Sequence, residues 1–449
     1  MFDVSTAVLI IVLLLGLVLL GVHVAVALGV TSAVGIYMVT GKLSIVEAML
    51  ASTSAEALRD FTFAVIPLFM LMGEFIGRSG AITDIYVAIN KGLRRIPARL
   101  AIATVLGNTV FSFVTGVSIA SAAAFSRIAY PEMKAHNYNR GFALGTIAGS
   151  SCLGMLIPPS VLMIVWGILT EQSIGRLFLA GVLPGVLLAT MFILYIFGIA
   201  ILRPEMVGEG AAHVDEVRVE GGLDTEKAEL AFRSLLVSMI GVGGIIAGVL
   251  GGIWWGLFTP TEGAGAGAAF ALILALIKGM KWRGFVDAIY SVGKTAAPIL
   301  ILLLLAALYS RTLAMTGVTS AIRGFFIESG LHAWQVLGII VLIWFVLGMI
   351  IDSISIMLLT VPIVEPVAMA FGFDQLSFAI VGIIAIEAGL LTPPFGLLVY
   401  TVKAAIQDNE VGVQHIFAAS IPYWIIMLFA VLLIVVFPQI SNFLPNAMF

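Results

Sequence analysis

The stretch Ser150–Val161, SSCLGMLIPPSV, decides how the rest of the chain is interpreted. It lies inside a long apolar region, yet it contains Gly154 and the pair Pro158–Pro159. Proline lacks an amide donor and its ring clashes with the preceding turn, so a regular helix does not continue cleanly through two consecutive prolines. The stretch therefore predicts a helix that is interrupted at membrane depth.

The same pattern occurs a second time at Ala388–Val399, AGLLTPPFGLLV. Gly389 precedes Pro393 at the same spacing by which Gly154 precedes Pro158. Interrupted apolar segments at corresponding positions of two halves are typical of secondary transporters whose binding site lies at the interruptions. We therefore expect a transporter built from two related halves.

The composition predicts an all-α polytopic membrane protein. Of the 449 residues, 61% are hydrophobic and 10% are charged, which leaves too few polar residues to cover a soluble core of this size. Long apolar runs favour helices over the short alternating strands of a membrane barrel. The first apolar run, Ala7–Thr40, is too long for a cleavable signal. The net charge of −3, with no basic stripe, gives no indication of nucleic-acid binding.

Two further segments are expected to enter the membrane and return as helical hairpins. Segment 100–129 has polar residues at its middle and basic residues on both sides, so the positive-inside rule places both ends in the cytoplasm. Segment 334–361 has Gly348 and Asp352 at its middle and acidic flanks, so it should open to the opposite side. Hairpins of opposite orientation predict an inverted repeat.

The expected plan therefore has three parts. The first inverted repeat covers 1–203, with its hairpin at about 100–129 and its broken helix at about 142–169; a polar linker covers 204–230; the second repeat covers 231–449, with its hairpin at about 334–361 and its broken helix at about 378–405. Before the second hairpin we expect a basic amphipathic piece, Lys278–Lys294, and a separate apolar piece, Pro298–Thr312.

The interruptions also predict the chemistry of the site. Free carbonyl oxygens and hydroxyls suit a hard cation such as sodium, whereas the amides of half-helix ends suit an anion. Ser112 and Thr115 lie on one helix face at the first hairpin tip and would meet Gly154–Pro159. The corresponding second set is Gly348, Gly389, Thr392 and the carbonyl group near Phe395. In the alternative interpretation, the prolines only kink two helices and the hydroxyls satisfy local backbone.

Two acidic residues lie close to these points. Asp352, at the second hairpin tip, is either a functional group in the membrane or the N-cap of a helix that begins at Ser353. Glu387 precedes the second interruption and could orient it. From their positions just past the sodium ligands, Ser118, Asp352 and Ser355 are expected to line a substrate cavity.

Enzyme signatures are missing from the sequence. It contains no HExxH motif, no His/Cys cluster at metal-ligand spacing and no glycine-rich phosphate loop with a lysine. The sequence also lacks an ATPase domain, so we expect transport to be driven by an ion gradient, with no cofactor beyond the coupling ion.

Several motifs together resemble one known family. They are FSFVTGVSIAS at Phe111–Ser121, GMLIPPS at Gly154–Ser160, LFLAGVLPG at Leu177–Gly185, FTPTE at Phe258–Glu262 and GLLTPP at Gly389–Pro394. In these motifs the chain resembles the large membrane subunit, of the DctM type, of tripartite ATP-independent periplasmic (TRAP) transporters.

The resemblance implies an elevator-type, sodium-coupled importer of a small organic acid such as a dicarboxylate or sialate. It implies a multi-pass protein of a bacterial or archaeal inner membrane, with two partners: a small four-helix membrane subunit, expected as a separate polypeptide, and a periplasmic substrate-binding protein. By the same resemblance, one sodium site falls on Ser112, Thr115, Gly154, Ile157 and Pro159, and the other on Gly348, Gly389, Thr392 and Phe395.

The sequence departs from the family pattern at the first hairpin tip. Where the family usually has Ser-Gly-Ser, this chain has Thr115-Gly116-Val117, so one hydroxyl near the substrate is lost. Two other classes of function remain open. One is a stand-alone sodium-coupled carrier of organic anions, and the other is a membrane scaffold, which would have no use for two unwound sites.

Overall fold

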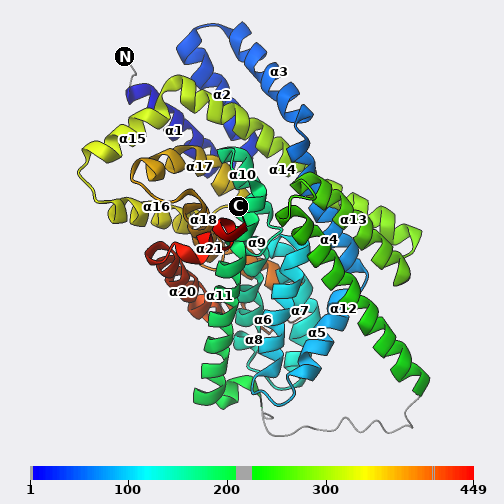
Figure 1. Ribbon diagram of the computed structural model, residues 1–449. Coiled ribbons are helices and arrows are strands. Elements are labelled where there is room, and N and C mark those ends of the chain that lie inside the picture. The colour runs from blue at the N-terminus through cyan, green and yellow to red at the C-terminus, as the bar shows by residue number, and fades with distance from the viewer. Residues whose placement is uncertain (1–3, 209–224, 407, 409, 449) are drawn as a thin grey trace.

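The computed structural model describes residues 4–208, 225–406, 408 and 410–448, and the elements in this part of the chain are helices (Figure 1). Eight of the described helices are long and apolar enough to cross a membrane. The predicted all-α multi-pass membrane fold is therefore confirmed. Of the expected linker 204–230, residues 209–224 lie outside the described residues, and a helix already begins at Thr225.

The first half of the chain ends with a long helix. Its elements are α1 (Val4–Leu19), α2 (Val24–Thr40), α3 (Leu43–Arg59), η1 (Phe61–Ala64), α4 (Val65–Arg78), α5 (Ala81–Gly92), α6 (Arg99–Thr115), α7 (Ser118–Ala135), α8 (Arg140–Ser151), α9 (Leu153–Leu156), α10 (Val161–Thr170) and α11 (Ile174–Leu202). A short 3-10 turn, η2 (Pro204–Val207), follows.

The second half repeats the order of a hairpin followed by a broken helix. Its elements are α12 (Thr225–Trp254), α13 (Pro260–Ile277), α14 (Trp282–Thr316), α15 (Val318–Glu328), α16 (Ala333–Gly348), α17 (Ser353–Ala370), α18 (Gln375–Gly389), α19 (Leu397–Ala405), α20 (Val413–Val436) and α21 (Gln439–Met448). Figure 1 shows α5–α8 in the lower half of the molecule and α15–α17 in the upper half.

The pieces expected at Lys278–Lys294 and Pro298–Thr312 belong mainly to one helix, and the expected separation is wrong. The helix α14 runs without interruption from Trp282 to Thr316 and contains Pro298 in its interior. A single proline removes one amide donor, a loss that helices in membranes tolerate. Two consecutive prolines act differently, because each of the Pro-Pro pairs lies in a gap between helices.

Both hairpins form as two helices joined by a short tip. At the first tip, α6 ends at Gly116, whose φ of +63° is the left-handed conformation that closes a helix without a Cβ penalty. Val117 then precedes α7 in an extended conformation. At the second tip, α16 ends at Gly348, and α17 begins after Asp352.

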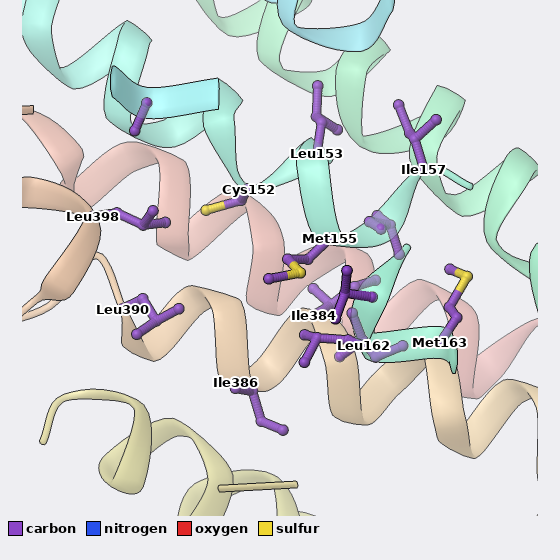
Figure 2. Packing of buried hydrophobic residues seen from close by; sticks show 14 of the residues in the cluster. Cys152, Leu153, Met155, Ile157, Leu162, Met163, Ile384, Ile386, Leu390 and Leu398 are labelled. Carbon is purple, nitrogen blue, oxygen red and sulfur yellow. The ribbon is translucent and has the colours of Figure 1, made fainter. Parts of the chain in front are cut away.

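The two halves meet along the broken helices. Helix α8 packs against α20, α10 against α17, and α7 against α19. Figure 2 shows Met155 and Leu162 of the first broken helix beside Ile384 of α18. An aromatic cluster extends this contact, since the Trp166 ring lies 6.0 Å from Trp344 and 5.8 Å from Phe378. The core is therefore shared between the halves.

Candidate transport site

The two halves place equivalent residues at equivalent points of the site. Val117 and Asp352 are the N-caps of the second hairpin helices, and Asn139 and Asp374 are the N-caps of the broken helices. Gly154 and Gly389 follow, and then Pro158 and Pro393. The members of each pair are separated by the same number of residues along the chain, so helix starts and interruptions keep one register in both halves.

The first hairpin tip is docked on the first interruption through its backbone. The Val161 amide donates to the Gly116 carbonyl oxygen over 3.1 Å. A Cβ on Gly116 would clash with the carbonyl oxygen of Pro159, and a Cβ on Gly154 would lie 3.0 Å from the Cα of Ser118. Only glycine permits these approaches, because the facing atoms are backbone atoms that cannot rotate away.

The second tip is docked on the second interruption in the same manner. The Phe395 amide donates to the Met349 carbonyl oxygen over 3.1 Å. A Cβ on Gly348 would lie 2.8 Å from the Cα of Gly389 and 2.7 Å from the carbonyl oxygen of Ile386. The structure therefore brings each hairpin tip to its own interruption, as the sequence predicted.

The hydroxyl groups of the expected sodium ligands donate to their own helices. Ser112 Oγ donates to the Asn108 carbonyl oxygen over 2.6 Å, and Thr392 Oγ1 donates to the Gly389 carbonyl oxygen over 2.6 Å. Thr115 Oγ1 likewise donates to Phe111 over 3.0 Å. Local backbone satisfaction, the alternative interpretation, thus accounts for the hydroxyl protons. The lone pairs of the oxygens stay available as acceptors, so the donor set of hydroxyls and carbonyls still fits a hard cation.

The two interruptions differ in exposure. All residues from Ser151 to Ser160 are buried, whereas Pro393, Pro394 and Phe395 are exposed. Pro393 and Pro394 line a cavity of about 560 Å³ together with Tyr400 of α19, Gly412 at the N-cap of α20, and the α20 residues Val413, Gln414, His415 and Phe417. The second interruption is therefore open to one surface of the molecule, and the first is enclosed.

The three residues expected to line a substrate cavity lie at the two tips. Asp352 accepts a hydrogen bond from the Ser355 amide over 3.0 Å, which confirms its role as the N-cap of α17. Ser118 and Ser355 are almost fully buried. The Ser118 hydroxyl has no hydrogen-bond partner, so it retains the capacity to bind a further group.

Sequence reasoning missed two polar contacts inside the site. The Asn108 side-chain amide donates to Ser150 Oγ over 2.7 Å and joins α6 to α8. Ser353 donates to the Glu387 carboxyl oxygen Oε1 over 2.7 Å and joins α17 to α18. In the sequence, both contacts are indicated only by polar side chains within apolar helices. The fold is needed to show which of these side chains meet.

A second polar cluster fixes the ends of α7 and α8 to the connection between α19 and α20. Asp408, 6% exposed, accepts hydrogen bonds from Lys134 Nζ over 2.7 Å and from Tyr130 Oη over 2.8 Å. The Lys134 ammonium and the Tyr130 hydroxyl hold the pKa of the Asp408 carboxyl well below its usual range. Arg140 pairs with Glu410 beside it. This ion-pair cluster lies where the basic flank of the first hairpin was predicted.

Two helical hairpins docked on two interrupted helices, within a bundle of long apolar helices, define the fold of a membrane transporter. Residues 11–440 match the family described as tripartite ATP-independent periplasmic transporter, DctM component. The chain belongs to this family, as its sequence motifs predicted.

Relatives within the family are large permease proteins of TRAP transporters. The chain is 30% identical over 395 residues to the C4-dicarboxylate TRAP transporter large permease protein DctM of Pseudomonas aeruginosa, covering 87% of this chain and 88% of that protein. It is 27% identical to the sialic acid large permease protein SiaM of Vibrio cholerae, covering 86% and 87%. It is 28% identical to the ectoine large permease protein TeaC of Halomonas elongata, covering 97% and 98%.

Solved structures show the same fold at low sequence identity. The YdaH transporter of Alcanivorax borkumensis superposes with a TM-score of 0.63 at 14% identity, covering 90% of both chains. MtrF of Neisseria gonorrhoeae superposes with a TM-score of 0.58 at 15% identity, covering 91% of this chain and 85% of that one. The comparisons thus support a transporter, and none of these relatives is named as an enzyme.

Proposed function

We propose that this chain is the large membrane subunit of a TRAP transporter that imports a small organic acid by coupling its uptake to a sodium gradient. The observation that carries the proposal is the docking of each hairpin tip on its interruption through a backbone hydrogen bond, Val161 to Gly116 and Phe395 to Met349. Such docking gathers hydroxyl and carbonyl oxygens at two points of the membrane domain, which is the environment that a hard cation requires.

The first proposed sodium site uses the ligands expected from the sequence. Ser112 and Thr115 would supply hydroxyl oxygens from the end of α6, and Gly154, Ile157 and Pro159 would supply carbonyl oxygens from the interruption. Its support is the enclosure of this interruption, since a buried cation site must exclude competing water. The second proposed site consists of Gly348, Gly389, Thr392 and the backbone of Phe395.

The substrate is proposed to bind between these sites. Ser118 begins α7, and Ser353 and Ser355 lie in the first turn of α17, so two helix N-termini come to this region. Helix N-termini favour a carboxylate. Asp352 does not pair with an anion, and we assign it to holding the second tip or to attracting the cation. Permeases named for C4-dicarboxylates, sialic acid and ectoine are all similar to the chain, so a carboxylate substrate fits its relatives.

The proposal includes the wider assembly. The two halves would act as inverted repeats, 1–203 and 231–449, and their hairpins would move together in an elevator mechanism. A small four-helix membrane subunit and a periplasmic binding protein would complete the transporter in a bacterial or archaeal inner membrane. The family supports both partners, because it is described as tripartite.

The deciding experiment is uptake into vesicles that contain the chain with its small subunit. Substrate uptake should require the binding protein and an inward sodium gradient, and it should not respond to ATP. Uptake without the binding protein would favour the stand-alone carrier. Uptake driven equally well by a proton gradient in the absence of sodium would exclude sodium coupling.

A further inference from the structure

Glu387 occupies a special position between the two halves. It corresponds in register to Cys152, since Glu387 and Cys152 lie two residues before Gly389 and Gly154. The Cys152 thiol lies 3.8 Å from the Glu387 carbonyl oxygen, so these equivalent residues touch each other. Glu387 therefore lies where the two halves meet, and it is the point at which they differ in chemistry.

The Glu387 carboxyl group is the buried link to both hairpin tips. The residue is 1% exposed, and its Oε1 accepts the hydrogen bond from Ser353. Ser118, the equivalent of Ser353 in the first half, lies beside the same carboxyl group. It packs against Gly154, two residues after the Cys152 that contacts Glu387. However, Ser118 Oγ and Glu387 Oε2 each lack a hydrogen-bond partner. The second tip is thus hydrogen-bonded to Glu387 through Ser353. The first tip lies beside Glu387, but its Ser118 hydroxyl does not yet donate to the carboxyl group.

Burying two polar atoms without hydrogen-bond partners costs free energy, and a hydrogen bond between the two atoms removes this cost. A small shift of the first tip toward Glu387 would satisfy both atoms at once. The carboxyl group offers two oxygens, one for each serine hydroxyl. Among the described residues, Glu387 forms no ion pair, so no basic side chain competes for it.

We propose that Glu387 is a positioning residue that couples the two hairpin tips, accepting hydrogen bonds from Ser353 and Ser118 together when both tips are seated. This inference rests on the transport function proposed above and deepens it. Seating of one tip then favours seating of the other, so the two proposed sodium sites fill cooperatively. Glu387 acts through the serines and is not itself a sodium ligand.

The test measures sodium binding without transport. The full chain in detergent is melted over a range of sodium chloride concentrations, with choline chloride holding the ionic strength constant. Ser118→Ala and Glu387→Ala should each raise the half-maximal sodium concentration by about three- to tenfold, the range that follows from losing one hydrogen bond. Each should also reduce the steepness of the sodium dependence. The double variant should be no worse than Glu387→Ala alone.

Two further variants sharpen the test. Ser126→Ala is the matched control, because Ser126 is also buried on α7 but donates to its own helix away from both tips, and the sodium dependence of this variant should stay as in the wild type. Glu387→Gln keeps one oxygen that accepts from one serine hydroxyl, and its amide N–H can donate to the oxygen of the other serine. Both tips then stay hydrogen-bonded, so the variant should retain the coupling. Additive effects of Ser118→Ala and Glu387→Ala would overturn the inference. A Glu387→Gln variant as impaired as Glu387→Ala would also overturn it, because the charge would then matter and not the hydrogen bonds.

The two proposals fail in different ways. If sodium does not stabilise the wild-type chain, the proposed sodium coupling is wrong. The double-mutant cycle between Ser118 and Glu387 is then measured on the melting temperature in sodium-free buffer. A coupling there would support the bridge between the tips without sodium, and independent effects would overturn it.

Discussion

Gly348 and Gly389 are packed so closely that a Cβ on either residue would fall within 3 Å of the backbone of the other. The contact joins the last residue of α16 to the last residue of α18. It holds the second hairpin against the second interruption where no side chain intervenes. Because the facing atoms belong to the backbone, neither helix can make room without shifting as a whole.

Gly348→Ala should therefore destabilise the protein strongly. Overpacking of this kind costs typically about 1–3 kcal/mol. The matched control is Gly338→Ala on the same helix, where a Cβ would meet no atom within 4 Å. The melting temperature in detergent should fall for Gly348→Ala and stay level or rise slightly for Gly338→Ala. Equal melting temperatures for the two variants would contradict the close packing.

The hydroxyls of Ser112 and Thr392 should set the sodium dependence of uptake. Ser112→Ala and Thr392→Ala each remove one proposed hydroxyl ligand and leave the neighbouring carbonyls in place. Each variant should raise the sodium concentration for half-maximal uptake without abolishing uptake. Ser126→Ala serves as the control, because Ser126 also donates to its own helix but lies away from both tips. Wild-type sodium dependence in both test variants would remove these residues from the sites.

Two variants of Asp352 should distinguish a structural role of this residue from a functional one. Asparagine is as good an N-cap as aspartate, whereas alanine costs typically about 1 kcal/mol. Asp352→Asn should therefore keep the wild-type melting temperature, and Asp352→Ala should lower it. We expect Asp352→Asn to transport poorly at every substrate concentration although it is folded, because the neutral side chain no longer attracts the cation. Normal uptake by Asp352→Asn would reduce Asp352 to a helix cap.

The Asp408 cluster should stabilise the protein except in acid. The pKa of Asp408 is lower in the folded protein than in the unfolded chain, so its contribution is fully present above the unfolded pKa. The contribution is lost as the pH falls through the folded value. Asp408→Asn should lower the melting temperature at neutral pH, and the difference from wild type should shrink as the buffer becomes strongly acidic. A difference that is constant down to strongly acidic buffer would contradict this assignment.

The inverted arrangement of the hairpins predicts opposite accessibility of their flanks. Cysteines placed at the exposed positions Ala135 and Gln375 should react with an impermeant thiol reagent from opposite sides of the membrane. The wild-type chain is the control, because its one cysteine, Cys152, is buried and should not react. Labelling of both sites from the same side would contradict the inverted repeat.

The sequence was sufficient for the hairpins and broken helices because each has a local cause. The Gly-and-Pro-Pro pattern interrupts a helix wherever it stands, and Gly116 closes one by its backbone conformation. The continuity of α14 could not be predicted in this way. A proline such as Pro298, preceded by charged residues, is also common at the end of a helix, so the local sequence does not tell the two cases apart. The link from Ser353 to Glu387 depends on where α17 and α18 meet, and no local pattern contains that information.

The uninterrupted course of α14 has a consequence for how the protein is seated in lipid. Its 35 residues extend about 52 Å, whereas a bilayer has a hydrocarbon core of about 30 Å. The exposed rings of Trp282 and Tyr290 lie in its charged first part, where Lys294 stacks over Tyr290. Such aromatic and basic groups anchor at the headgroup level. The anchored first part of α14 therefore sets how deeply the whole helix lies in the bilayer. A change in bilayer thickness should change the tilt of α14 along its full length.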